Sequence, residues 1–164
     1  IHLESPVDAD SVSVSLQSDG IDDKNGNAQT SGSASALSMD GVAPTLNDTS
    51  KIDDTTIQVT FTDGVDVDET SIDASDFSLS SGSIASVTPR ETETGAAVDI
   101  DLSSPVDTNS VNISITGDIN DTSGNSLTSG RRTVFDMDGI APTTASFKLS
   151  NPSKQNVSIS FKSD

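Results

Sequence analysis

The side chains in this sequence best suited to chemistry are carboxylates. There are 26 acidic residues against 8 basic ones, and most of the acids are aspartates in short polar stretches. Asp40 precedes a glycine, and further acids crowd the stretches 63–68 and 118–121. Oxygen ligands of this kind suit Ca²⁺, which binds about 6–8 of them. Loops are also where an acidic surface places its aspartates, so a solvated surface is the alternative interpretation.

Catalysis has little support in the sequence. His2 is the single histidine and cysteine is absent, so no nucleophilic triad can be assembled. A pair of carboxylates could serve a glycosidase, but tryptophan and tyrosine, which would hold a sugar ring, are both absent. We therefore expect no enzyme activity.

The sequence repeats itself at a spacing close to one hundred residues. The segment Met39–Thr45 (MDGVAPT) returns as Met137–Thr143 (MDGIAPT), and Ser5–Asp8 returns as Ser104–Asp107. Such a period is typical of tandem arrays. Proline fixes its own φ and keeps the preceding residue out of helical backbone, while glycine lets the chain turn. The repeated segment is therefore predicted to be a short, stiff joint between folded units.

The repeat divides the chain into three parts. Residues 43–138 form one complete unit, residues 1–42 the C-terminal part of a preceding unit, and residues 139–164 the N-terminal part of a following one. Ile1–Leu3 aligns with Ile100–Leu102 and is predicted to end a strand. We interpret the chain as a window on a longer array. The alternative is a subunit whose exposed ends are completed by its neighbours in a polymer.

Apolar residues alternate with polar ones in short runs, which is typical of half-buried strands. The clearest run is 56–61, where Ile57, Val59 and Phe61 share one face. Seven strands are predicted in the complete unit, near residues 45–49, 56–61, 77–79, 84–87, 98–102, 111–115 and 134–137. No stretch longer than a turn shows helical spacing. We predict an all-β fold of tandem immunoglobulin-like antiparallel β-sandwich modules.

Three motifs in the complete unit resemble a known family. They are Asp40–Thr45 at the joint, Val67–Phe77 before the third strand, and the Asp-x-x-Gly-Asn turn within Asp121–Leu127. Together they are similar to the Ig-like domains of prokaryotic surface-layer proteins and large adhesins (the SbsA-type Ig-like family). The chain departs from that family at Val111, where the family often has tyrosine. The resemblance implies the sandwich fold and a location at the cell surface.

Alternate loops of a seven-strand sandwich share one pole, because each strand reverses direction. The joint, the loop after the second strand and the loop after the sixth should therefore meet, together with a loop of the preceding unit. We predict a Ca²⁺ site at this first joint, with ligands among Asp8, Asp10, Asp40, Asp63, Asp66, Asp68, Asp118, Asn120 and Asp121. The second joint would use Asp107 and Asp138.

The formal charge of −18 points to a salt-loving source. At 1 M salt the screening length falls to about 3 Å, so the acidic surface repels itself far less there. Disorder is the alternative for so acidic a chain, but the regular period-2 runs argue against it. Calcium loading of the acids is a further alternative. The charge also excludes binding to nucleic-acid phosphates or anionic lipid.

The sequence predicts an extracellular, cell-surface protein with a mechanical role, as a segment of a surface layer or stalk. Its expected partners are neighbouring copies of itself, with no nucleic acid and no direct insertion of this segment in a membrane. The alternative is an adhesin or an extracellular filament assembled end to end. Four positions fit the N-glycosylation acceptor pattern: Asn47, Asn112, Asn120 and Asn156.

Overall fold

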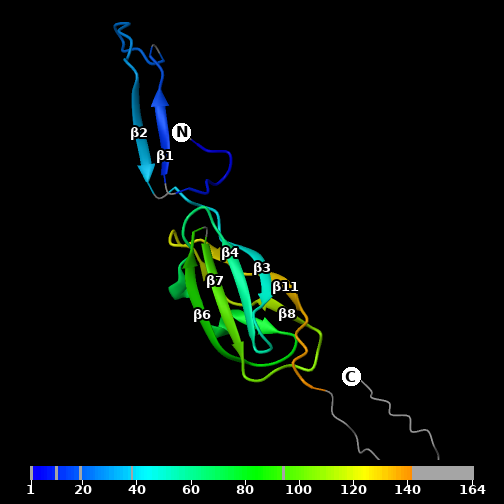
Figure 1. The fold of residues 1–164 in the computed structure, drawn as a ribbon. Coiled ribbons are helices and arrows are strands. Elements are labelled where there is room, and N and C mark those ends of the chain that lie inside the picture. The colour runs from blue at the N-terminus through cyan, green and yellow to red at the C-terminus, as the bar shows by residue number, and fades with distance from the viewer. Residues whose placement is uncertain (1, 10, 19, 38, 94, 142–164) are drawn as a thin grey trace, which may run out of the picture.

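The structure is a computed structural model that describes residues 2–9, 11–18, 20–37, 39–93 and 95–141. Its regular structure is almost entirely β, arranged in antiparallel sheets, as the sequence predicts (Figure 1). No helix in the described ranges is long and apolar enough to cross a membrane. The candidate ligand Asp10, the sequon Asn156 and residues 142–164 of the predicted third unit lie outside the described residues.

Two sheets make up the complete unit. The larger has the strand order β3-β4-β7-β6, and the smaller has the order β11-β8-β5; every neighbouring pair is antiparallel. The strands of the larger sheet are β3 (Thr45–Lys51), β4 (Thr56–Thr62), β6 (Ile84–Thr92) and β7 (Gly95–Leu102). Those of the smaller are β5 (Phe77–Leu79), β8 (Ser110–Ile115) and β11 (Gly130–Phe135). All seven overlap strands predicted from the apolar pattern, but β11 is shifted toward the N-terminus and ends at Phe135, before the predicted end at residue 137.

One apolar core lies between the two sheets. Along β4 the side chains of Ile57, Val59 and Phe61 are at most 1% exposed, while the residues between them are only partly buried. The same alternation in β8 buries Val111 and Ile113 from the opposite sheet, and all five belong to a single cluster. Burial of this kind is the dominant stabilising term in a fold without disulfides. The arrangement is consistent with a β-sandwich.

Four short elements lie within segments that the sequence predicts to be acidic or polar loops. The 3₁₀ turns η1 (Glu69–Ser71) and η2 (Ala74–Asp76) lie between β4 and β5, and the strands β9 (Ile119–Asn120) and β10 (Ser126–Leu127) lie between β8 and β11. Asp73 and Asp76 form a reciprocal capping box around η2. These acids therefore satisfy backbone N–H groups and are not free surface charges.

A separate hairpin precedes the complete unit. It consists of β1 (Ser11–Leu16) and β2 (Gly32–Leu37), and it extends away from one end of the two-sheet body (Figure 1). Apolar and polar residues alternate along β1, as they do in β4 and β8. The predicted strand end at residues 1–3 was wrong for His2 and Leu3, which lie in no strand. A strand needs a partner for its backbone, and these two residues find none among the described ones.

The two joints are held in the same way. At the first joint, Asp40 forms a parallel bridge with Val7, and the Gly41 N–H donates to the Val7 carbonyl at 2.8 Å. At the second, Asp138 forms a parallel bridge with Val106, and the Gly139 N–H donates to the Val106 carbonyl at 3.1 Å. The Asp40 and Asp138 carboxylates each accept from the backbone N–H two residues on, both at 3.1 Å. The sequence repeat is thus also a structural repeat.

Candidate metal centre

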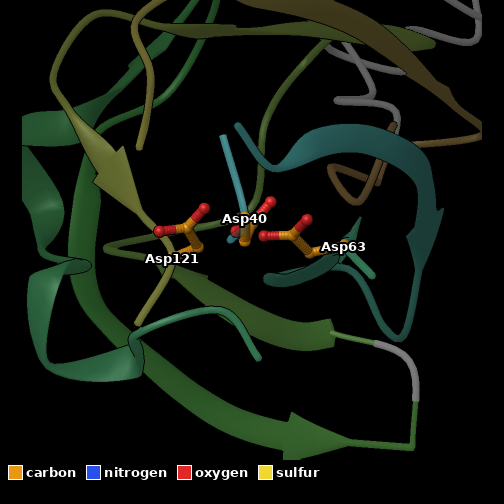
Figure 2. Close-up of side chains that lie close together, drawn as sticks. All are labelled: Asp40, Asp63 and Asp121. Carbon is orange, nitrogen blue, oxygen red and sulfur yellow. The ribbon is translucent and has the colours of Figure 1, made fainter. Parts of the chain in front are cut away.

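Three loops meet at the first joint and bring three aspartates together (Figure 2). Asp40 lies in the joint itself, Asp63 directly follows β4, and Asp121 directly follows β9. One carboxylate oxygen of each residue lies within 4.8 Å of the other two. We call these three residues the acidic cluster.

Backbone contacts between two loops fix the place of Asp121. Val67 and Asp121 form an antiparallel bridge. The Asp68 N–H donates to the Asn120 carbonyl at 2.8 Å, and the Thr122 N–H donates to the Asp66 carbonyl at 2.9 Å. The loop that begins at Asp63 and the loop that contains Asp121 are therefore joined by main-chain bonds, so the cluster does not depend on mobile side chains to assemble.

A tight turn orients the Asp121 carboxylate. Its Oδ1 accepts from the Ser123 and Asn125 backbone N–H groups, both at 2.8 Å, and Gly124 takes the left-handed conformation (φ 89°) that the turn requires. The Asn125 side-chain Nδ2 donates to Asp121 Oδ2 at 2.8 Å and to Asp40 Oδ2 at 3.2 Å. Asn125 thus positions two members of the cluster. Asn125 was not among the predicted ligands, although the Asp-x-x-Gly-Asn pattern contains it.

Asp63 is the member whose charge is least compensated. Its Oδ1 accepts one bond, from the Gly64 N–H at 2.9 Å, while its Oδ2 is buried and has no hydrogen-bond partner among the described residues. Burial is the main cause that raises the pKa of Asp63, and together with the nearby carboxylates of Asp121, Asp40 and Asp8 it brings that pKa to about 6. A carboxylate in this position favours a proton or a cation beside it.

Asp121 is only 2% exposed, yet it favours the charged form. Burial alone would raise the pKa of Asp121, but the hydrogen bonds that it accepts from the Asn125 side chain and from the Asn125 and Ser123 backbone N–H groups lower it. A buried negative charge that is hydrogen-bonded in this way persists near neutral pH. The cluster therefore pairs one stably ionised carboxylate with one that resists ionisation.

Asp8, from the segment before the β1–β2 hairpin, brings a fourth carboxylate to the joint. It lies so close against Gly64 that a Cβ atom at position 64 would overlap the Asp8 carboxyl group. An open pocket of about 310 Å³ lies beside the contact, lined by Asp8, Val42, Ala43, Thr45, Thr62, Asp63 and Gly64. A cation in this region would therefore be close to acids from both sides of the joint.

The structure does not bring the other predicted ligands into the cluster. Asp68 caps η1 by accepting from Thr70, and the Asn120 side chain accepts from Ser126. Asp66 and Asp118 are exposed and lie outside the acidic cluster. Asp107 and Asp138 are exposed at the second joint, where residues beyond 141 are not described. Local hydrogen bonds engage the side-chain oxygens of Asp68, Asn120 and Asp138, and such bonds cannot be predicted from the placement of loops alone.

Among the described residues, no basic side chain forms an ion pair with the acidic cluster. In the part of the chain that the structure describes, the ion pairs are Lys51–Asp54 and Arg90–Asp99, and neither involves a cluster residue. Several carboxylates close together in a partly buried place repel one another unless a counter-charge is present. The donor set is all oxygen, which fits a hard cation such as Ca²⁺.

The described sequons differ in accessibility. Asn47 is exposed on β3, at a bulge where the register with β4 shifts. Asn112 is partly buried and accepts from Thr133 at 2.7 Å, and Asn120 accepts from Ser126. An acceptor amide must be free to react, so Asn47 is the described position best placed for modification. Glycosylation of all four asparagines stays a prediction.

Comparison with known proteins gives one informative similarity. The chain is similar to halomucin from Haloquadratum walsbyi (strain DSM 16790 / HBSQ001), with 37% identity over 119 residues. The similarity covers 66% of this chain, and the chain spans about 1% of the length of that relative. No family model and no solved structure matches the chain. The resemblance to the SbsA-type Ig-like family therefore stays a prediction.

The raised pKa of Asp63 predicts a specific pH dependence in the presence of a chelator. Its ordinary value is 3.8 and its folded value is about 6, so its contribution to stability is full below 3.8 and is lost as pH rises through 6. The midpoint of thermal unfolding should therefore rise as pH falls from 7 to 5, at constant molar salt. Circular dichroism melts of the chain and of Asp63→Asn check this. A dependence that is equally steep in Asp63→Asn would contradict the assignment.

Proposed function

We propose that this chain is a non-enzymatic structural segment of an extracellular cell-surface protein, built of tandem immunoglobulin-like modules. The strand order supports the module. If β3, β4, β5, β6, β7, β8 and β11 are lettered A to G, the two sheets contain A-B-E-D and G-F-C. That is the strand order of constant-type immunoglobulin domains. Residues 43–138 would be one complete module, with parts of two others on either side.

The observation that carries the proposal is the identity of the two joints. The same bridge, the same glycine N–H bond and the same aspartate turn occur at Val7–Asp40 and at Val106–Asp138. A binding or catalytic site would have no need to recur at both ends of a folded unit. A connector that sets the angle between successive units would need to recur, because every link of an array has the same geometry.

We infer that the first joint holds Ca²⁺. The ligands would be Asp40, Asp63 and Asp121, with Asp8 from the preceding unit. A half-turn of the Asn125 amide would present its oxygen to Asp40 and Asp121 in place of its Nδ2. Water would supply the remaining ligands toward the usual total of about 6–8. The ion would replace repulsion between the two sides of the joint by attraction, and so stiffen the link.

The surface location and the salty habitat rest on two supports. The first is the similarity to halomucin from Haloquadratum walsbyi. The second is the formal charge of −18, with a sequence pI near 4.1. A carboxylate-rich surface keeps a protein soluble in concentrated salt, where its self-repulsion is screened. Partners in a lattice would be neighbouring copies, and the adhesin and filament alternatives stay predictions from the sequence.

Flexibility across the first joint tests the mechanical role. The chain has no cysteine, so spin labels can be placed at Ser33→Cys on the hairpin and Thr88→Cys on β6. The distribution of distances between them should be narrow with Ca²⁺ and broad with a chelator. Asp40→Ala should leave it broad in both conditions.

Asp138→Ala is the matched control. It removes the same carboxylate and the same turn bond at the second joint, which lies outside the labelled span, so calcium should still narrow the distribution. Equal widths with and without calcium in the unsubstituted chain would refute the proposed stiffening.

A further inference from the structure

The β1–β2 hairpin has an edge and an apolar face without partners among the described residues. Within the described part of the chain β1 pairs only with β2, and the side chains of Val12, Val14 and Leu16 are not buried. An isolated two-stranded hairpin is marginally stable in water, and a free strand edge is a template for further pairing. The hairpin therefore has the properties of an incomplete sheet.

The hairpin is a structural copy of the β8–β11 pair in the complete unit. Leu16 pairs with Gly32 as Ile115 pairs with Gly130, and the registers agree along both strand pairs. The turn at Asp23–Asn27 in the hairpin also matches the turn at Asp121–Asn125 in the complete unit, because each of its three side-chain hydrogen bonds has a counterpart there. The Asp23 Oδ1 accepts from the Asn25 and Asn27 N–H groups, the Asn27 Nδ2 donates to Asp23 Oδ2 at 2.9 Å, and Gly26 has φ 83°.

The complete unit shows what covers such a pair. β5 occupies the edge of β8 that is free in β1, and β3 lies beside β11. The inner face packs against β4 and β7, so that Val111, Ile113 and Ile115 are at most 5% exposed. Val12, Val14 and Leu16 occupy the equivalent positions in the hairpin. At the turn, the Asn125 Nδ2 donates a hydrogen bond to the joint residue Asp40. Asn27 is oriented by its own turn in the same way.

We propose that the hairpin is a docking surface for one occupant, a segment with the strand pattern of residues 43–99. A strand like β5 would pair with the free edge of β1, and strands like β4 and β7 would cover the inner face. A joint aspartate would bind at the Asp23–Asn27 turn. This inference rests on the proposed tandem modules, but it does not depend on the calcium site.

The test adds a copy of residues 43–99 directly before Ile1 of the full chain, because Ile1 aligns with Ile100. Single cysteines report burial cleanly, since the chain has none. In a chelator at molar salt, a thiol reagent should label Val14→Cys roughly a hundredfold more slowly in the extended chain, because reaction then requires local opening. Leu37→Cys should react equally fast in both, because its counterpart Phe135 is 62% exposed in the complete unit.

A second extended chain carries Ile57→Asp and Val98→Asp in the added copy only. These charges prevent the copy from packing, so Val14→Cys should react as fast as in the original chain. Equal labelling of Val14→Cys in the original and extended chains would overturn the proposal. So would slow labelling that persists in the charged control or extends to Leu37→Cys, because the covering would then not be specific.

Discussion

Asp63→Asn should stabilise the calcium-free chain and abolish most of its response to calcium. Asparagine keeps the shape of the side chain but removes a buried charge whose Oδ2 has no partner among the described residues. The repulsion from Asp121, Asp40 and Asp8 disappears with that charge. In the unsubstituted chain, calcium at about 100 times its Kd should add about 2.7 kcal/mol to the free energy of unfolding. Denaturant melts with calcium and with a chelator measure both effects.

Asp66→Asn is the matched control for this substitution. It makes the same change of charge three residues away, on an exposed side chain outside the cluster. It should leave the calcium response nearly intact and change the calcium-free stability little. The assignment of Asp63 would fail if both variants lost the response equally, or if Asp63→Asn destabilised the calcium-free chain.

Stability should also rise steeply with monovalent salt. The chain carries a formal −18, and few of its acids are paired with bases in the described residues. Raising the salt from 0.01 M to 1 M shortens the screening length from about 30 Å to about 3 Å. The compact state suffers most from self-repulsion, so we expect a gain on the order of 5 kcal/mol in the free energy of unfolding.

Thermal melts in NaCl and in KCl measure this gain. A chelator in both series removes any contribution from bound calcium. The two salts should act alike if general screening is the cause. Sucrose at matched water activity serves as the control, because it leaves the charges unscreened. Melting that is indifferent to salt would remove the physical argument for a salt-loving source.

The strands could be predicted from the sequence because their burial follows the period of the pleat. In β4 and β8 every second residue is apolar, and those residues are the ones that the structure buries. The short elements could not be predicted in this way. β9 and β10 have two residues each, and η1 and η2 have three, so they are too short for any periodicity and are fixed by caps and turns.

The candidate site was predicted at the level of loops and missed at the level of atoms. Strand reversal alone brings the loops of Asp40, Asp63 and Asp121 to one end. Which oxygens remain free depends on local bonds, such as the cap that engages Asp68. The role of Asn125 was not predicted, because it depends on a turn in which Gly124 takes the left-handed conformation.

The proposed stiffening of the chain requires a cation that binds at the first joint. The most direct measurement is anomalous diffraction from crystals of this chain grown with calcium at molar salt. A single strong peak within ligand distance of Asp40, Asp63 and Asp121, with Asp8 beside it, is the result that we predict. Ordered water alone among these carboxylates, or calcium only at scattered surface aspartates, would contradict the central claim.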